Sequence, residues 1–133
     1  MAGKSAAEAK AASYHHGDLK LALVKAAREI LRKDGADALS LRAIAAAVGV
    51  SHMAPYAHFK NKQELLQAIA AAGFNDLADR LLAVKSRTKR ERDLAANYGA
   101  EYIRFALENP EVYRIMLSQA DPAGRMKHKD ANR

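Results

Sequence analysis

The chain has 133 residues, half of them hydrophobic, and a formal net charge of +7. This length allows one domain, or one small domain and part of another. The basic charge favours a polyanionic partner, and by itself it does not choose between nucleic acid and an anionic membrane. Cysteine is absent, so disulfides and thiolate metal sites are excluded.

The residue patterns predict an all-α protein. No stretch alternates convincingly with period two, and β-branched residues are few. No apolar run reaches the roughly 18 residues of a membrane-spanning helix, and residues 1–13 lack the apolar core of a signal peptide. We therefore expect a cytoplasmic protein, with a flexible arm at residues 1–13 and a disordered tail at residues 121–133.

The first predicted helix runs from Leu19 to about Lys33. Asp18 precedes it as the expected N-cap, and Asp34-Gly35 follows as its end. Its apolar residues recur at helical spacing and form one face. They are Leu19, Ala22, Leu23, Ala26, Ala27, Ile30 and Leu31.

Residues 40–62 predict two short helices joined by a tight turn. Ser40 is an N-cap whose hydroxyl can accept from a free backbone N–H, and Gly49 stands where helices commonly end in the left-handed conformation. Ser51 is a second N-cap, opening a helix through His58. This pattern is typical of a helix-turn-helix, which places its second helix in the DNA major groove. The apolar face of the first helix is Leu41, Ile44, Ala45 and Val48.

Pro55 is the unusual residue of this segment. It follows Ser51 by four residues, near the edge of the first helical turn, so we expect it to cost less than the roughly 3 kcal/mol of a helix interior. Phe59 is expected to turn into the core. Asn61 is a third N-cap, and Glu64 completes a capping box.

Three further helices follow. The first continues from Asn61 to about Val84, and a charged junction at residues 85–92 leads to a helix over about 89–108. Asn109-Pro110 is a cap-then-N1 signal for the last helix, which Asp121-Pro122 ends. The residues expected to face inward are Leu65, Leu66, Ile69, Ala72, Phe74, Leu77, Leu81, Leu82, Leu94, Tyr98, Tyr102, Phe105, Ala106, Val112, Tyr113, Met116 and Leu117.

Polar and basic side chains gather on or just after the second short helix. No acidic residue interrupts the chain between Ser40 and Lys62. All of the gathered groups can bond phosphate oxygens or base edges. The alternative interpretation is that these helices form an ordinary helical bundle. The exposed polar and basic cluster favours the interpretation as a DNA-binding segment. Its members are His52, Tyr56, His58, Lys60 and Lys62.

Several segments carry a resemblance to a known family. They are ALVKAAREILRKDG, LSLRAIAAAVGVSHMAPYAHFKNKQELLQAI, YHHGDL at residues 14–19, and RFALENPEVYRIML at residues 104–117. Together they resemble the tetracycline-repressor (TetR) family of bacterial transcription regulators, in a subgroup that carries YHHGDL. The resemblance implies a DNA-binding head at residues 14–62, joined by a long helix to a partial ligand-binding and dimerisation domain at residues 63–120.

The resemblance also implies roles for single residues, some of which would contact base edges and others the DNA backbone. Ser51, His52 and Met53 match the base-facing start of the recognition helix. Lys62 matches a phosphate contact at a helix N-terminus. Tyr56 and His58 match phosphate-contacting positions, while Ser40 and Arg42 match positions that touch phosphate or a base edge.

The aromatic residues of the later helices have two readings. Such a set is more often plain core, whereas in TetR relatives the corresponding helices wall a cavity for an inducer that reorients the heads. The candidates for ligand contact are Phe74, Tyr98, Tyr102, Phe105, Tyr113 and Met116.

Family members are usually longer, with two further helices that form a four-helix dimer interface. We expect a homodimer from the resemblance, although the chain ends before such helices could fit. A fragment, a truncated product or a different mode of dimerisation would each account for this.

The leading interpretation is a sequence-specific transcriptional regulator. It would be a repressor that binds a palindromic double-stranded operator and is released by a small apolar or amphipathic effector. The alternative is a basic helical module that binds a protein partner or an anionic surface. We expect no enzyme and no cofactor, because the chain shows no nucleotide loop, metal cluster or nucleophile–base pair. His15-His16 is a poor metal site, because adjacent side chains on an extended segment diverge.

Overall fold

A computed structural model describes residues 16–120 and confirms the all-α class. The expected arm and tail, Tyr14, His15 and the Asp121-Pro122 stop lie outside the described residues, as does the His16 side chain. Within the described range there are five α-helices and three short 3-10 helices. The elements are α2 (His16–Asp34), η1 (Ala36–Ala38), α3 (Leu41–Val48), η2 (Ala54–Ala57), α4 (Lys62–Arg87), η3 (Glu91–Asp93), α5 (Leu94–Glu108) and α6 (Pro110–Ala120).

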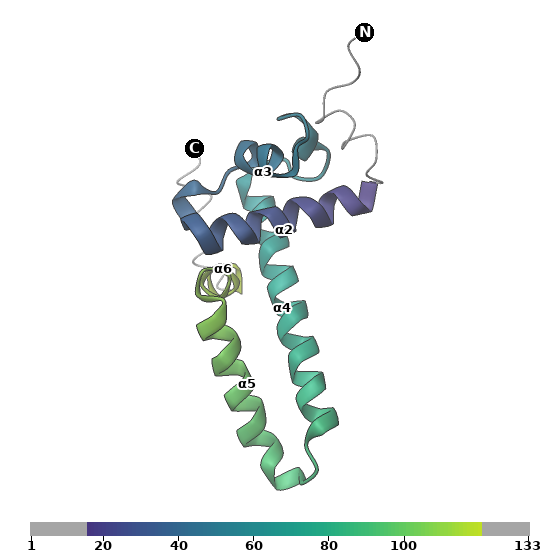
Figure 1. Ribbon diagram of the computed structural model, residues 1–133, viewed down its shortest axis with the longest axis vertical. Coiled ribbons are helices and arrows are strands. Elements are labelled where there is room, and N and C mark those ends of the chain that lie inside the picture. Colours follow the sequence, from purple (N-terminus) through teal and green to yellow (C-terminus); the bar gives the residue numbers. More distant parts are fainter. Residues whose placement is uncertain (1–15, 121–133) are drawn as a thin grey trace.

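The helices form a compact end and a long stalk (Figure 1). α2 lies across α4 near the beginning of α4, with α3 on its far side, and α4 then extends away. α5 returns beside α4, and α6 packs against α4 beneath one end of α2. None of the helices in residues 16–120 combines the length and apolar character needed to cross a membrane.

The start of α2 differs from the prediction. The helix begins at His16, so Asp18 lies inside its first turn and is not its N-cap. An acidic side chain is favourable there because the first turn carries the positive end of the helix dipole. The predicted end is confirmed: α2 ends at Asp34, and Gly35 has a φ of 85°, which only glycine adopts readily.

The predicted caps of α3 and α4 are confirmed by their hydrogen bonds. Ser40 Oγ accepts from Ala43 N over 3.0 Å, and Gly49 ends α3 with a φ of 83° and a ψ of 32°. Asn61 Oδ1 accepts from Glu64 N over 3.0 Å. The Glu64 carboxylate reaches back to the amide of Lys60 over 2.7 Å, one residue before the cap. These local bonds fix where each helix begins and ends.

The stalk boundaries differ from those expected. α4 continues past Val84 to Arg87, and α5 begins at Leu94 after the η3 turn, five residues later than Lys89. Pro110 is the first residue of α6, as predicted. The Asn109 side chain, however, donates to the Phe105 carbonyl at the end of α5 over 3.1 Å.

One buried apolar cluster connects the compact end to the stalk. It includes Leu23 and Leu31 of α2, Ile69 of α4 and Met116 of α6. α4 and α6 approach closely at Gly73, where a Cβ would lie 2.6 Å from Met116 Sδ. The side chains of α6 therefore pack directly against the backbone of α4 at this crossing.

Four residues that were expected to face inward are exposed instead. Helical spacing alone could not place them, because it does not say which faces of a helix the rest of the fold covers. They are Phe74, Leu82, Tyr102 and Leu117.

A buried carboxylate ties α5 to α4. Glu101 is 7 % exposed, and its oxygens lie 2.6 Å from Arg104 Nη1, 3.3 Å from Arg87 Nη2 and 3.6 Å from Arg80 Nη1. Arg80 also pairs with Glu108 over 2.9 Å. A charge so far removed from water needs such partners, since an unpaired buried carboxylate is costly.

Candidate nucleic-acid interface

Residues 40–62 form the end of the molecule opposite the α4–α5 turn (Figure 1). The structure exposes eight of the nine side chains expected to contact DNA, and it leaves His58 half-buried. We call the eight exposed residues the head surface. They are Ser40, Arg42, Ser51, His52, Met53, Tyr56, Lys60 and Lys62.

The expected recognition helix is a turn followed by the short 3-10 helix η2, so the prediction of an α-helix from Ser51 to His58 is wrong. Pro55 explains the difference. In an α-helix the backbone N–H of residue 55 would donate to the Ser51 carbonyl, but proline has no N–H. The proline ring would also crowd that carbonyl. The Ser51 carbonyl instead accepts from Ala54 N over 3.0 Å, and Tyr56 N donates to the Met53 carbonyl over 3.1 Å. The ladder is thereby shifted to i→i+3 bonds.

The segment is held in place by buried residues beneath it. Val50, Pro55 and Phe59 are buried, which confirms the inward turn expected for Phe59. The Pro55 carbonyl accepts from both His58 N and Phe59 N, each over 2.9 Å. Lys20 of α2 places its ammonium 5.9 Å from the centre of the Phe59 ring. The head surface therefore projects from a packed base.

Large apolar side chains are exposed among the polar groups of the head surface. Met53 is 61 % exposed and Tyr56 is 51 % exposed. Exposed side chains of this size contribute little to folding, and they suit contact with a thymine methyl group or a sugar–phosphate edge. His58 is half-buried, with its ring tilted against that of Phe59 at 6.3 Å.

Lys62 is the first residue of α4, a helix of 26 residues. The positive end of the helix dipole and the unpaired amides of the first turn favour an anion at this position. The nearest carboxylate in sequence, Glu64, is occupied by the Lys60 amide. Lys62, Lys60 and Arg42 therefore give the head surface a cationic character with no acidic side chain in residues 40–62.

The six side chains expected to contact a ligand differ widely in exposure. Phe105 and Met116 are buried in the core, Phe74 and Tyr102 are exposed, and the rest are half-buried. Tyr102 and Tyr113 meet hydroxyl to hydroxyl at 2.7 Å. That hydrogen bond, with burial second, raises the pKa of Tyr102.

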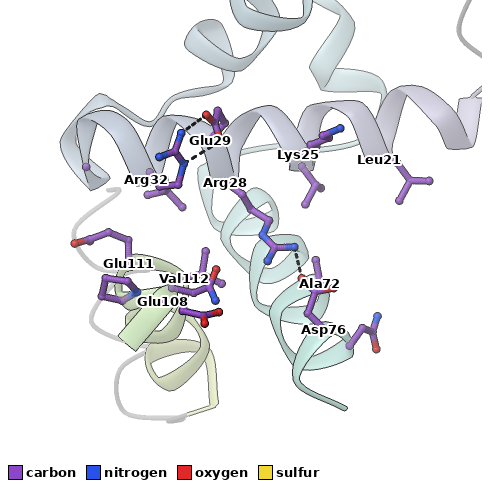
Figure 2. A pocket seen from close by; sticks show the side chains of 16 residues that line it. Leu21, Lys25, Arg28, Glu29, Arg32, Ala72, Asp76, Glu108, Glu111 and Val112 are labelled. Atoms are coloured by element: carbon purple, nitrogen blue, oxygen red, sulfur yellow. Dashed lines mark hydrogen bonds and ion pairs between the residues drawn. The ribbon is translucent and has the colours of Figure 1, made fainter. Parts of the chain in front are cut away.

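A pocket of about 890 Å³ lies elsewhere, at the junction of α2, α4 and the α5–α6 corner (Figure 2). None of the six ligand candidates lines it. We call it the junction pocket. Sequence reasoning missed it because its walls come from three segments far apart in the chain, and no local spacing signals such a site. In residues 16–120 no group of three potential metal ligands lies together.

Comparison with known proteins gives matches over the same region. Residues 23–69 match the family described as bacterial regulatory proteins, tetR family. The uncharacterized HTH-type transcriptional regulator YobS of Bacillus subtilis (strain 168) is 31% identical over 96 residues, which are 71% of this chain and 49% of that protein. The tetracycline repressor protein class A from transposon 1721 of Escherichia coli is 42% identical over 50 residues, 38% of this chain and 23% of that protein.

A solved structure of a protein with unknown function from Rhodococcus sp. RHA1 is also similar. It superposes with a TM-score of 0.70 and 37% identity, covering 86% of this chain and 62% of that one. The chain thus spans about half the length of YobS and less of the tetracycline repressor. The helix-turn-helix segment lies inside residues 23–69, the range that matches the tetR family of bacterial regulatory proteins.

Proposed function

We propose that this chain is a sequence-specific DNA-binding transcriptional regulator that contacts double-stranded DNA through its head surface. The observation that carries the proposal is the surface itself. Its cations and its exposed Met53 and Tyr56 stand on a packed base, and no carboxylate interrupts them. The names of the two curated relatives, a transcriptional regulator and a repressor, support the same conclusion.

Within this proposal the head surface divides into two groups. Ser51, His52 and Met53 come first in the turn before η2, and they are assigned to base edges. The Ser40 hydroxyl already accepts from Ala43 N, and its proton stays available for a phosphate oxygen. The remaining members, Arg42, Tyr56, Lys60 and Lys62, with His58, are assigned to the backbone.

The rest of the proposal concerns regulation. The chain would act as a cytoplasmic repressor, would bind a palindromic operator as a homodimer, and would release it when a small effector binds the helices beyond the head. Its support is the tetR-family match of residues 23–69 and the single buried cluster that joins the head to α6. That cluster gives a change in the stalk a physical route to the head.

Selection of bound sequences from a randomised pool of double-stranded DNA tests the proposal. A palindromic consensus is expected, because paired half-sites mirror a two-fold dimer. An enriched single half-site would support the DNA-binding head and overturn the homodimer. No enrichment over the starting pool would overturn sequence-specific binding.

A further inference from the structure

The junction pocket has the size and lining of a small-molecule site. Its volume of about 890 Å³ lies within the usual range of about 300–1,000 Å³ for ligand pockets. α2 forms one wall, α4 another and the α5–α6 corner the third (Figure 2). Apolar side chains from all three walls take part, namely Leu21, Val24, Leu31, Ala72 and Val112.

The charges that line the junction pocket are almost all paired within the protein. Every lining carboxylate has a cationic partner, so none is left to attract a cationic ligand. The pairs are Glu29 with Arg32 and Lys33, Asp76 with Arg28, Glu108 with Arg80, and Glu111 with Arg114.

Lys25 is the exception among these lining charges. Within residues 16–120 it makes no ion pair or side-chain hydrogen bond, so the unpaired charge of the pocket is positive. Arg28 follows three positions later on α2, which places both cations on one side of the helix. Figure 2 shows Arg28 reaching from α2 toward Asp76 on α4. Its Nη1 lies 2.6 Å from Asp76 Oδ2.

We propose that the junction pocket binds an amphipathic organic anion. Its acidic group would lie between Lys25 and Arg28, and its apolar part would lie against Leu21, Val24 and Val112. Asp76 is the intramolecular competitor, because a carboxylate ligand would take the place that the Asp76 carboxylate holds beside Arg28. Arginine presents several N–H donors and can share them between two carboxylates, so displacement need not be complete.

A ligand bound in the junction pocket would change the contact between α2 in the head and α4 in the stalk. Among the ion pairs of residues 16–120, the one between Arg28 and Asp76 joins α2 to α4. A ligand that binds better when this pair is open shifts the protein toward that arrangement. This regulatory consequence rests on the proposed function, whereas the binding site itself does not.

Titration of the full chain with decanoate, followed by amide chemical shifts and by calorimetry, tests the site without DNA. Decyltrimethylammonium has the same alkyl chain and the opposite charge. Decanoate is expected to bind with shifts concentrated on α2, residues 72–76 and residues 108–112, and decyltrimethylammonium at least about tenfold more weakly. Equal binding of the two probes, or shifts confined to the exposed residues Phe74, Leu82 and Tyr102, would overturn the proposal.

Two substitutions should change decanoate affinity in opposite directions. Lys25→Gln should weaken it about tenfold, since a hydrogen bond to a charged group is lost. Asp76→Asn should strengthen it about threefold, because a like charge is removed and Arg28 loses its competitor. Lys85→Gln, an exposed cation on α4 outside the pocket, is the matched control and should have no effect. An unchanged affinity in Lys25→Gln, or a weaker one in Asp76→Asn, would overturn the proposed binding mode.

A separate DNA-binding measurement distinguishes the site from its consequence. Decanoate should weaken binding of the selected DNA, and less so for Lys25→Gln. Decanoate binding with no effect on DNA affinity would support the site and overturn the regulatory role. If the chain selects no DNA sequence, the proposed function fails while the decanoate titration still decides the site.

Discussion

Gln63 Nε2 in the first turn of α4 donates to Gln119 Oε1 near the end of α6 over 2.9 Å. This bond joins the beginning of α4 to α6, a helix that is distant in sequence. The other side-chain atom of Gln119, Nε2, is buried and has no hydrogen-bond partner in the part of the chain that the structure describes. The two glutamines therefore contribute unequally to stability.

The unequal partners give the first prediction. Gln63→Ala should destabilise the protein by about 1–3 kcal/mol, because it leaves both polar atoms of buried Gln119 without partners. Gln119→Met should be nearly neutral, because it removes the unsatisfied donor along with the bond and conserves the unbranched shape. Urea denaturation of the two variants measures the difference. A larger loss in Gln119→Met than in Gln63→Ala would contradict this account.

The second prediction concerns the α4–α6 crossing. Gly73→Ala should destabilise the protein by about 1–3 kcal/mol, since overpacking outweighs the gain in helix propensity. The added Cβ would lie 2.6 Å from Met116 Sδ and 3.0 Å from Val112 Cγ1, and both side chains are buried.

Gly99→Ala is the matched control for Gly73→Ala. A Cβ at Gly99 meets nothing within 4 Å on an exposed face of α5, so this change should stabilise by about 0.5–1 kcal/mol. Thermal unfolding of both variants gives the comparison. Stabilisation by both changes would show that Met116 and Val112 move aside at low energetic cost, and it would contradict this prediction.

The third prediction separates backbone contacts from base reading. Lys62→Ala should weaken binding to every DNA sequence and should reduce the slope of log affinity against log salt by about 1, since one phosphate contact is lost. His52→Ala should instead relax preference at one position, at a cost of about 1–3 kcal/mol on the preferred sequence. Fluorescence anisotropy at several salt concentrations measures both effects.

Lys85→Ala is the control for this series, because Lys85 is exposed on the stalk outside the head surface. If Lys62→Ala kept full affinity for DNA at every salt concentration, the assigned contact surface would be wrong. If His52→Ala weakened binding equally for all DNA sequences, His52 would contact the DNA backbone and not a base edge.

The fourth prediction concerns the paired tyrosines of α5 and α6. The Tyr113 hydroxyl raises the pKa of Tyr102 above its ordinary value of about 10. A raised pKa in the folded state means that the contribution of Tyr102 to stability is fully present below the ordinary value and is lost as pH rises through the raised one. Absorbance of tyrosinate against pH should show a late phase that Tyr102→Phe removes.

Two further variants identify the cause of that late phase. Tyr113→Phe should move it toward the ordinary range, because the hydrogen bond between the hydroxyls is gone. Tyr98→Phe changes a tyrosine outside the pair and should leave the phase in place. Persistence of the late phase in Tyr102→Phe would mean that another tyrosine produces it.

Local signals in the sequence were sufficient for both ends of α3 and for the start of α4. Ser40, Gly49 and Asn61 were predicted from residue type alone, and all three adopt the expected backbone and bonds. Capping depends on atoms within four residues, which is why neighbours in sequence suffice. Pro55 was misjudged because its effect depends on which carbonyl its missing N–H would have bonded.

Features that depend on partners far along the chain could not be predicted in this way. Phe74 and Tyr102 fit a helical apolar pattern, yet both side chains are exposed. Glu101 pairs with Arg80 and Arg87 of α4, and nothing in the residues next to it in sequence signals those partners. Arg28 of α2 and Asp76 of α4 are separated in sequence by η1, α3 and η2, and neither carries a signal of the other. The spacing of apolar residues predicts one face of a helix, and only tertiary packing determines which residues that face contacts.

The 3-10 geometry that Pro55 imposes on η2 also limits how much DNA this element can follow. Its residues, Ala54–Ala57, rise about 2.0 Å each, so the element is only about 8 Å long. Successive base pairs are about 3.4 Å apart, which leaves it alongside about two steps of the duplex. The three residues proposed to read bases, Ser51, His52 and Met53, lie in the turn just before this short element. An operator for this head should therefore have a very short invariant core in each half.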